Sequence, residues 1–403
     1  MANNSLRQSI LFSVGFRPFF LAASGYGALA LGAWTGWLGE LWALPEVYPT
    51  GALHGHEMMF GFALAAVAGF LLTAVPQWTS STPTRSVALA ALAGAWLIGR
   101  LAMLGAGTIG PIGAMALDLL FPLGLCLAIG AKLVKAQNRH NYGFIVLLGL
   151  AALANFCWHM EMAGFTNELE GVFVDELSGT ALELMLNLLL IIVAIMGGRV
   201  IPMFSANWMR HQGEVLPIVH PEWLKRSSII GLILVAGAEF LSPILDERYT
   251  GILAMLAGLA YLIRLRGWNG YRTYAHPLVW ILHLAYFWLC LALFLKGGQY
   301  LGAVPEAAAR HAAAVGAVGT MIMAIMPRVS LGHSGRDLIL PRPMLAAYAL
   351  FVLTPVLRVA SPFLNDDLSQ IALTASGLCW TGAFAIFLAT FAPILLSPRV
   401  DQK

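Results

Sequence analysis

Long apolar stretches recur along the whole chain, separated by short polar ones. A helix needs about 20 apolar residues to cross the hydrocarbon core of a bilayer. Twelve stretches come close to that length, so the sequence predicts an all-α, polytopic membrane protein that forms a single integral membrane domain over residues 1–403. The predicted spans are 16–38, 54–75, 86–105, 110–131, 142–163, 180–201, 227–245, 250–264, 276–295, 307–327, 344–362 and 369–396.

The composition supports the same class of protein. Of the residues, 59% are hydrophobic and only 11% are charged, whereas about a quarter of a soluble domain is charged. The net charge of +3 is small and gives no indication of nucleic-acid binding. The four cysteines are scattered and no C-x-x-C-H motif occurs, so a covalently attached haem is not expected.

Basic residues between the spans predict the orientation. If the loops alternate between two sides, the side of the N-terminus collects most of the 23 lysines and arginines. By the positive-inside rule, both termini are then cytoplasmic. The acidic stretch from Glu168 to Glu176 falls on the opposite, outer side.

Three spans end on similar proline motifs, "LTAVPQW", "GRVIPMF" and "MAIMPRV". Their prolines, Pro76, Pro202 and Pro327, recur at nearly equal intervals, which predicts three four-helix units. Because proline commonly ends a helix, coincidence is the alternative. Three such units in a pseudo-threefold bundle resemble the core subunit of haem–copper oxidases, and the likeness concerns the fold alone. The units would cover roughly residues 1–140, 141–265 and 266–403.

Histidines inside the predicted spans are candidate metal ligands, because ionisable groups in a membrane are costly and usually functional. Neutral imidazole ligates haem iron and copper. Two positions along a helix differ by about 200°, so His54 and His56 are expected to serve two different centres. His311 is then a natural ligand opposite His56. In the alternative interpretations, these histidines cap a helix, lie at the membrane interface or occupy core positions where their hydrogen bonds are satisfied. The candidate ligands are His54, His56, His159, His283 and His311.

Charged residues in the outer halves of the spans surround these histidines. In the functional interpretation, Arg100 and Arg358 hold haem propionates, while carboxylates orient the ligands or deliver protons. In the alternative, arginines and glutamates form buried ion pairs. Asp118 is isolated in the fourth span and fits either interpretation. The candidate catalytic carboxylates are Glu57, Glu161 and Glu183.

Two motifs at the cytoplasmic ends of the spans, "GGRVIPMFSANW" and "MPRVSLGHSGR", combine glycine with basic residues such as Arg199 and Arg328. Turns of this kind can hold a phosphate or a carboxylate. Solvated loops that set the topology are the alternative interpretation.

Four motifs carry a resemblance to the NnrS family of haem- and copper-containing bacterial membrane proteins, over nearly the whole chain. They are "FRPFF", "HGHEMMFGFALAAVAGFLLTAVPQW", "GGRVIPMFSAN" and "RHAAAVGAVGTMIMAIMPRVSLGHSGR". The last one has Ser334 where the family usually has threonine. The resemblance implies a protein of the bacterial inner membrane with non-covalent haem b, and with copper as a second candidate. It also implies induction with denitrification and protection against nitrosative stress.

The leading hypothesis is therefore a haem-containing or haem–copper membrane protein that binds nitric oxide and detoxifies or reduces it. Its partners would be nitric oxide, membrane lipid and an unknown electron donor. Whether it is an oxidoreductase like nitric oxide reductase stays open, because the sequence lacks the three-histidine copper motif of the oxidases. The alternatives are a transporter of a metal, haem or metal–nitrosyl species, and a non-enzymatic sensor or scavenger of nitric oxide.

Overall fold

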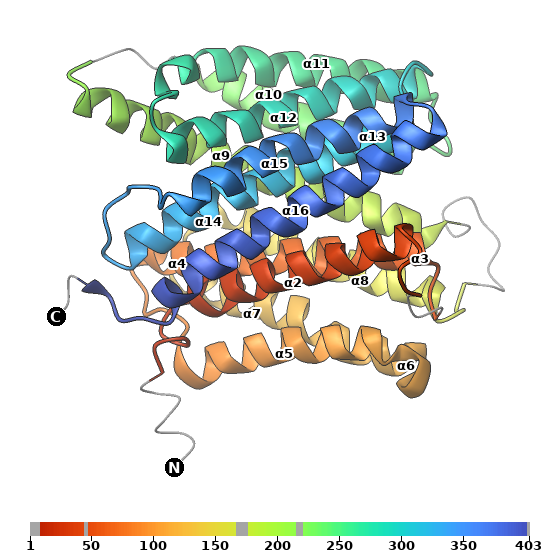
Figure 1. The fold of residues 1–403 in the computed structure, drawn as a ribbon, viewed down its shortest axis with the longest axis horizontal. Helices are drawn as coiled ribbons and strands as arrows, with labels where there is room; N and C mark the ends of the chain where they lie inside the picture. Colours follow the sequence, from red (N-terminus) through yellow and green to blue (C-terminus); the bar gives the residue numbers. More distant parts are fainter. Residues whose placement is uncertain (1–8, 44–46, 167–175, 215–220, 401–403) are drawn as a thin grey trace. The chain divides into compact units, whose positions relative to one another are not determined.

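The computed structural model describes residues 9–43, 47–166, 176–214 and 221–400, so most of the acidic stretch between Glu168 and Glu176 lies outside the described residues. Within these ranges a helix occupies each of the predicted places (Figure 1). The helices are α2 (Phe16–Leu38), α3 (Thr50–His56), η1 (Glu57–Ala63), α4 (Leu64–Thr79), α5 (Ser86–Leu104), α6 (Ala106–Asp118), α7 (Leu120–Lys135), η2 (Arg139–Asn141), α8 (Gly143–Met162), α9 (Leu177–His211), α10 (Glu222–Phe240), α11 (Glu247–Arg266), η3 (Gly270–Thr273), α12 (Pro277–Tyr300), α13 (Glu306–His311), η4 (Ala312–Gly319), α14 (Thr320–His333), α15 (Pro343–Ala360), η5 (Ser361–Phe363) and α16 (Asp366–Leu395).

Among the described residues, 10 helical segments are long and apolar enough to cross a membrane. The twelve predicted spans include two more, α2 and α10, which form helices of 23 and 19 residues but are not among these 10 segments. Arg17 lies in the first turn of α2, and α10 begins with the charged stretch "EWLKR". For these two helices, the prediction of a membrane span therefore rests on the alternation of the loops between the two sides of the membrane.

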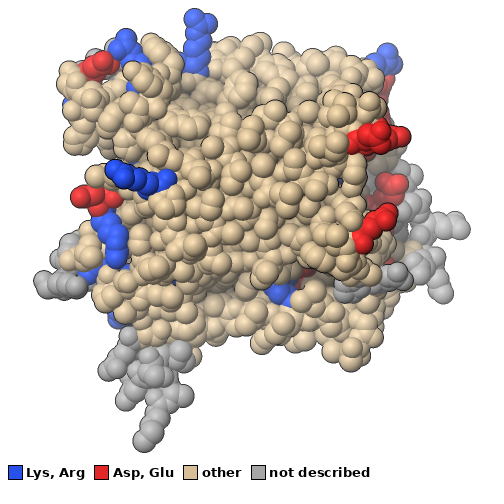
Figure 2. All heavy atoms as spheres, viewed as in Figure 1, with Lys and Arg blue, Asp and Glu red and all other residues tan. Residues whose placement is uncertain are grey.

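The surface also fits a membrane protein. Almost all of the face drawn in Figure 2 consists of uncharged residues. Large apolar side chains point outward, such as Leu29 and Leu127, which are 73% and 72% exposed. Contiguous apolar surface on this scale indicates contact with lipid rather than water.

The three prolines of the predicted repeat lie inside helices rather than at their ends. Pro76, Pro202 and Pro327 are internal to α4, α9 and α14, which all continue beyond them. The predicted helix ends at these positions were wrong, because the turns around a proline can supply the missing backbone contacts. The threefold repeat itself stays a prediction.

Two spans contain a π-helical segment, a feature that often marks a functional site. In the second span, η1 follows α3, and in the tenth span, η4 follows α13. His56 and His311 are the last residues of α3 and α13, so each directly precedes a π-helix. Two of the candidate ligands thus share one local context.

The chain divides into two compact units, which are described separately. Unit 1 comprises residues 1–188, 329–337 and 387–403, and unit 2 comprises 189–328 and 338–386. In unit 1, α2 packs against α4 and η1, while α5 packs against α6 and α7. In unit 2, α12 packs against α11 and η4.

Candidate metal centre

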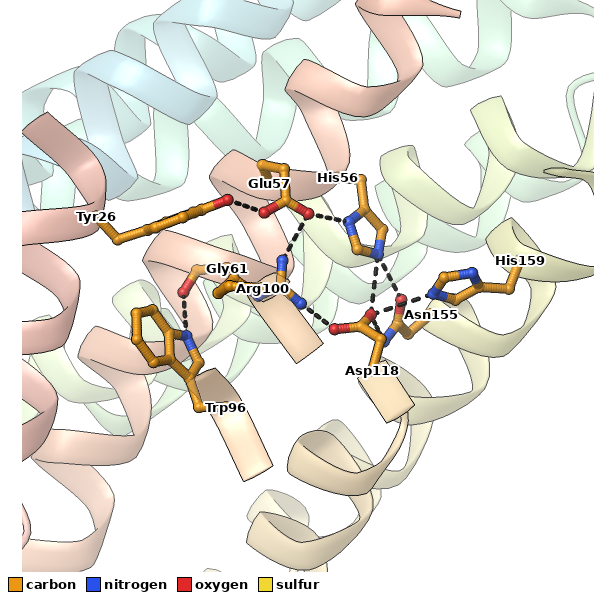
Figure 3. Close-up of polar contacts among 9 residues, drawn as sticks. All are labelled: Tyr26, His56, Glu57, Gly61, Trp96, Arg100, Asp118, Asn155 and His159. Carbon is orange, nitrogen blue, oxygen red and sulfur yellow. Dashed lines mark hydrogen bonds and ion pairs between the residues drawn. The ribbon is translucent and has the colours of Figure 1, made fainter. Parts of the chain in front are cut away.

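Five helical segments of unit 1 bring five ionisable side chains into one buried cluster (Figure 3). His56 ends α3, Glu57 begins η1, Arg100 lies near the end of α5, Asp118 ends α6, and His159 lies in the last turn of α8. None of these residues is more than 8% exposed. Ionisable groups buried this completely need partners, and each finds its partner within the cluster.

Glycines allow the helices to approach closely enough to form the cluster. A Cβ atom on Gly99 would lie 2.7 Å from Asp118 Oδ1, and one on Gly61 would lie 3.0 Å from Arg100 Nη1. The backbone of η1 is also supported, because Trp96 Nε1 donates a hydrogen bond of 2.8 Å to the Gly61 carbonyl. The sequence thus leaves room for the charged groups where the helices meet.

Three of the side chains have the geometry of a metal site. His56 Nε2 and His159 Nε2 each lie 3.2 Å from Asp118 Oδ2. The three ligand atoms all lie within 4.8 Å of one another. With metal–ligand bonds of about 2.0–2.2 Å, ligand atoms of one metal are spaced similarly. Two histidines and one carboxylate are the donor set of non-haem iron, and imidazole also suits copper and zinc.

Glu57 orients the first of these ligands. His56 Nδ1 donates to Glu57 Oε1 over 2.8 Å, which turns Nε2 toward Asp118. Glu57 also accepts hydrogen bonds from Tyr26 Oη and, over 2.6 Å, from Arg100 Nη1. A metal-bound histidine usually donates its other ring N–H to a carboxylate or carbonyl, which fixes the orientation of the ring. Figure 3 shows this series of hydrogen bonds, which leads from Tyr26 through Glu57 to His56.

Asn155 links the two halves of the metal site. Its Oδ1 atom lies 2.8 Å from His56 Nε2, and its Nδ2 donates to Asp118 Oδ2 over 2.8 Å. Both nitrogens of His56 therefore face acceptor oxygens, so in this arrangement the ring carries two N–H groups and a positive charge. A metal ion at Nε2 would take the place of that second proton.

The charges of the cluster also favour a cation. Arg100 forms ion pairs with Glu57 and Asp118, as the ion-pair interpretation of the sequence predicts. Two carboxylates against one guanidinium leave one excess negative charge when both histidines are neutral. An unbalanced buried charge is destabilising by several kcal/mol. A proton or a metal ion between the histidines and Asp118 removes this imbalance.

The remaining candidates of unit 1 lie in other surroundings. The His54 ring stacks on Trp34 with centroids 4.2 Å apart, so His54 and His56 point into different environments, as their spacing predicts. Glu161 accepts bonds from the backbone nitrogen and the hydroxyl of Ser178, at 2.6 and 2.9 Å, at the start of α9. Glu183 is half-buried on α9.

Three candidates belong to unit 2. His311 Nδ1 donates to the Ala307 carbonyl over 2.8 Å, which leaves Nε2 as the nitrogen with the lone pair when the ring is neutral. Arg358 donates to Ser361 Oγ over 3.1 Å. His283 Nε2 lies 2.7 Å from Ser205 Oγ. The joint ligation of one haem by His56 and His311 would link the two units, and it stays a prediction.

The surroundings of His56 fit a single metal ion better than a haem. Both ring nitrogens are engaged, and the ring packs against Trp158 and Phe60 with centroids 4.2 and 5.0 Å away. A porphyrin would have to displace these side chains. His311 has the orienting hydrogen bond that is typical of a metal-bound histidine.

Sequence reasoning left two functional positions unassigned. Asp118, at the centre of the site, fitted either interpretation because its partners come from other spans. Asn155 was overlooked, although it precedes His159 by four residues and so lies on the same face of α8. A polar residue one helical turn from a candidate ligand was the available signal.

Comparison with protein families gives one match. A sequence model described as "NnrS protein" matches residues 10–399, nearly the whole chain. The comparison with curated proteins found no match.

Proposed function

Because the chain belongs to the NnrS family, we propose that it is a membrane protein that binds nitric oxide at a metal ion held by His56, Asp118 and His159. Family membership suggests a membrane protein related to nitric oxide. The observation that carries the proposal is the set of three buried ligand atoms within 4.8 Å of one another. A structural ion pair alone would need neither two histidines nor the carboxylate behind one of them.

The residues of the cluster would have different roles in such a site. The two histidines supply nitrogen ligands and Asp118 supplies an oxygen ligand, which leaves coordination positions open, as in catalytic metal sites. Iron or copper bound there would pass on electrons from the unknown electron donor and would supply the empty position to which nitric oxide binds. Glu57 holds His56 in place, and Arg100 holds both carboxylates.

Burial of the site suits this ligand. Nitric oxide is small and uncharged, so it dissolves in the bilayer and needs no aqueous channel. The Trp158 and Phe60 rings around His56 exclude larger ligands. If the protein reduces nitric oxide, two protons are consumed for each pair of molecules, and the contacts from Tyr26 through Glu57 to His56 offer a path for them.

A haem fits better in unit 2 than at His56. In this proposal His311 would hold the haem iron and Arg358 would hold a propionate. Support comes from the packing of α13 against α15, which carry these two residues, and from the Nδ1 hydrogen bond of His311. His54 would serve a second centre.

We further propose that the protein lies in the bacterial inner membrane with both termini in the cytoplasm, because of the distribution of basic loops.

Anaerobic titration with nitric oxide tests the proposed function. The purified protein should take up nitric oxide with a change in its absorption and paramagnetic spectra. Stripping the metal with a chelator should abolish the uptake that leaves the haem spectrum unchanged, and restoring ferrous iron or copper should recover it. If this part of the uptake persists without metal, the proposal is contradicted. A metal-free protein that moves metal ions into sealed vesicles would support the transporter hypothesis instead.

A further inference from the structure

A second polar site lies in unit 2, far along the chain from the metal ligands. A cavity of about 680 Å³ opens between the C-terminal ends of α9 and α14 and the start of α12. All of these helix ends fall on the predicted cytoplasmic side. The polar and aromatic lining includes Phe204, Trp208, Arg210, His211, His276 and Arg328.

Two lining residues carry buried polar atoms that have no hydrogen-bond partner in the described part of the chain. They are Nη1 of Arg328 and Nδ1 of His276. A buried donor without a partner costs about 1–3 kcal/mol, and more when the group is charged. Most buried polar atoms of native proteins are hydrogen-bonded, so a ligand in the cavity would supply partners that the described residues do not.

The charged residues that line the cavity are all basic. Two arginines line it, and no carboxylate belongs to the lining. The Arg328 guanidinium lies 3.6 Å from the centroid of the Phe204 ring, and this cation–π contact stabilises the charge without neutralising it. The cavity therefore has a positive potential that favours an anion.

We propose that this cavity binds the phosphate or carboxylate group of an amphipathic organic anion. The volume is many times the roughly 30 Å³ of a water molecule, so an inorganic ion alone would not fill it. Part of the wall is apolar, with Val279, Leu338 and the largely exposed Ile339 beside the arginines. Guanidinium groups bind phosphate and carboxylate in a bidentate manner.

The anion has two possible sources with the same chemistry. Basic pockets between membrane helices on the cytoplasmic side bind the head groups of anionic lipids. A soluble organic anion from the cytoplasm would use the same arginines. Neither source involves the metal, so the inference goes beyond the proposed function.

Thermal unfolding of the full chain, followed with defined additives, tests the inference. The melting temperature should rise in nanodiscs of phosphatidylglycerol relative to phosphatidylcholine if the source is lipid. It should rise with citrate or inorganic phosphate in neutral detergent if the source is soluble. Arg210 is exposed, so Arg210→Gln should leave folding intact, while the affinity for the effective anion should fall about fivefold or more. Arg272→Gln is the matched control, because Arg272 is ion-paired with Glu214 and does not line the cavity.

Arg328→Gln gives a second, independent signature. Removing an unpaired buried charge should leave the ligand-free protein as stable as wild type or more so, while the response to the anion is lost. A purely structural arginine would instead lower the melting temperature. The proposal is overturned if no anion shifts wild type, or if Arg210→Gln and Arg328→Gln respond like wild type. The metal content of every variant should stay unchanged, which separates this result from failure of the metal site.

Discussion

Replacing Glu57 by glutamine tests the orientation of the metal ligand without changing its shape. Glu57 Oε1 accepts from His56 Nδ1 and Arg100 Nη1, and Oε2 accepts from Tyr26. A glutamine oxygen can keep the first two bonds, while its amide donates to the Tyr26 hydroxyl. The variant therefore keeps the contacts and loses one negative charge behind the metal ligand.

The size of the effect follows from the cluster's charges. Without metal, Glu57→Gln removes the charge that offsets the second proton of His56. Once that proton is lost, Arg100 is balanced by Asp118, so stability should change little. With a divalent metal, the variant has one negative charge fewer to offset it, and His56 becomes a weaker ligand. Loss of the carboxylate that accepts from a metal-bound histidine weakens metal binding about 10- to 100-fold. This corresponds to roughly 1.4–2.8 kcal/mol.

The assay is a competitive metal titration of purified protein against a chelator of known affinity. Glu161→Gln is the matched control, because Glu161 is also an embedded glutamate of unit 1 but contacts Ser178. Its metal affinity should stay within about twofold of wild type. Equal affinity in Glu57→Gln and wild type, or an equal loss in both variants, would refute the role of Glu57 as the orienting carboxylate.

Three further predictions concern packing, haem and topology. Gly99→Ala should lower the metal content, because its Cβ would lie 2.7 Å from Asp118 Oδ1, whereas Gly94→Ala on the same helix meets no atom within 4 Å and should be neutral by metal analysis. If haem is bound in unit 2, His311→Ala should change its absorption spectrum, and an unchanged spectrum would exclude His311 as its ligand. Reporter fusions in the stretches Lys132–His140 and Arg264–Tyr274 should report a cytoplasmic location, and an outer location would reverse the proposed orientation.

The apolar stretches predicted where helices occur, because a span long enough to cross a bilayer is visible in the sequence itself. Their detailed course was harder to predict. Pro76 lies inside a continuing helix, and the π-helix η1 depends on backbone contacts that no residue pattern reveals. The sequence of η4 likewise gives no sign of its π-helical register.

The candidate site could be predicted only in part. His56, Glu57, Arg100 and His159 were all singled out as ionisable groups in apolar surroundings. The sequence did not show that Asp118 joins them, because the five residues lie on four different spans and the rotation of a helix about its axis is set by packing. Close approaches such as that at Gly99 decide which faces meet.

Elemental analysis of the purified protein tests the central claim most directly. His159→Gln is the informative variant, because the only partner of His159 Nε2 in the cluster is Asp118 and its Nδ1 has none among the described residues, so its loss disturbs folding least. His140→Gln, at a predicted cytoplasmic loop, is the control. We predict about one iron or copper ion per chain at this site in wild type and in His140→Gln, and its loss in His159→Gln. Equal metal content in all three proteins would contradict the assignment of His56, Asp118 and His159 as the metal centre.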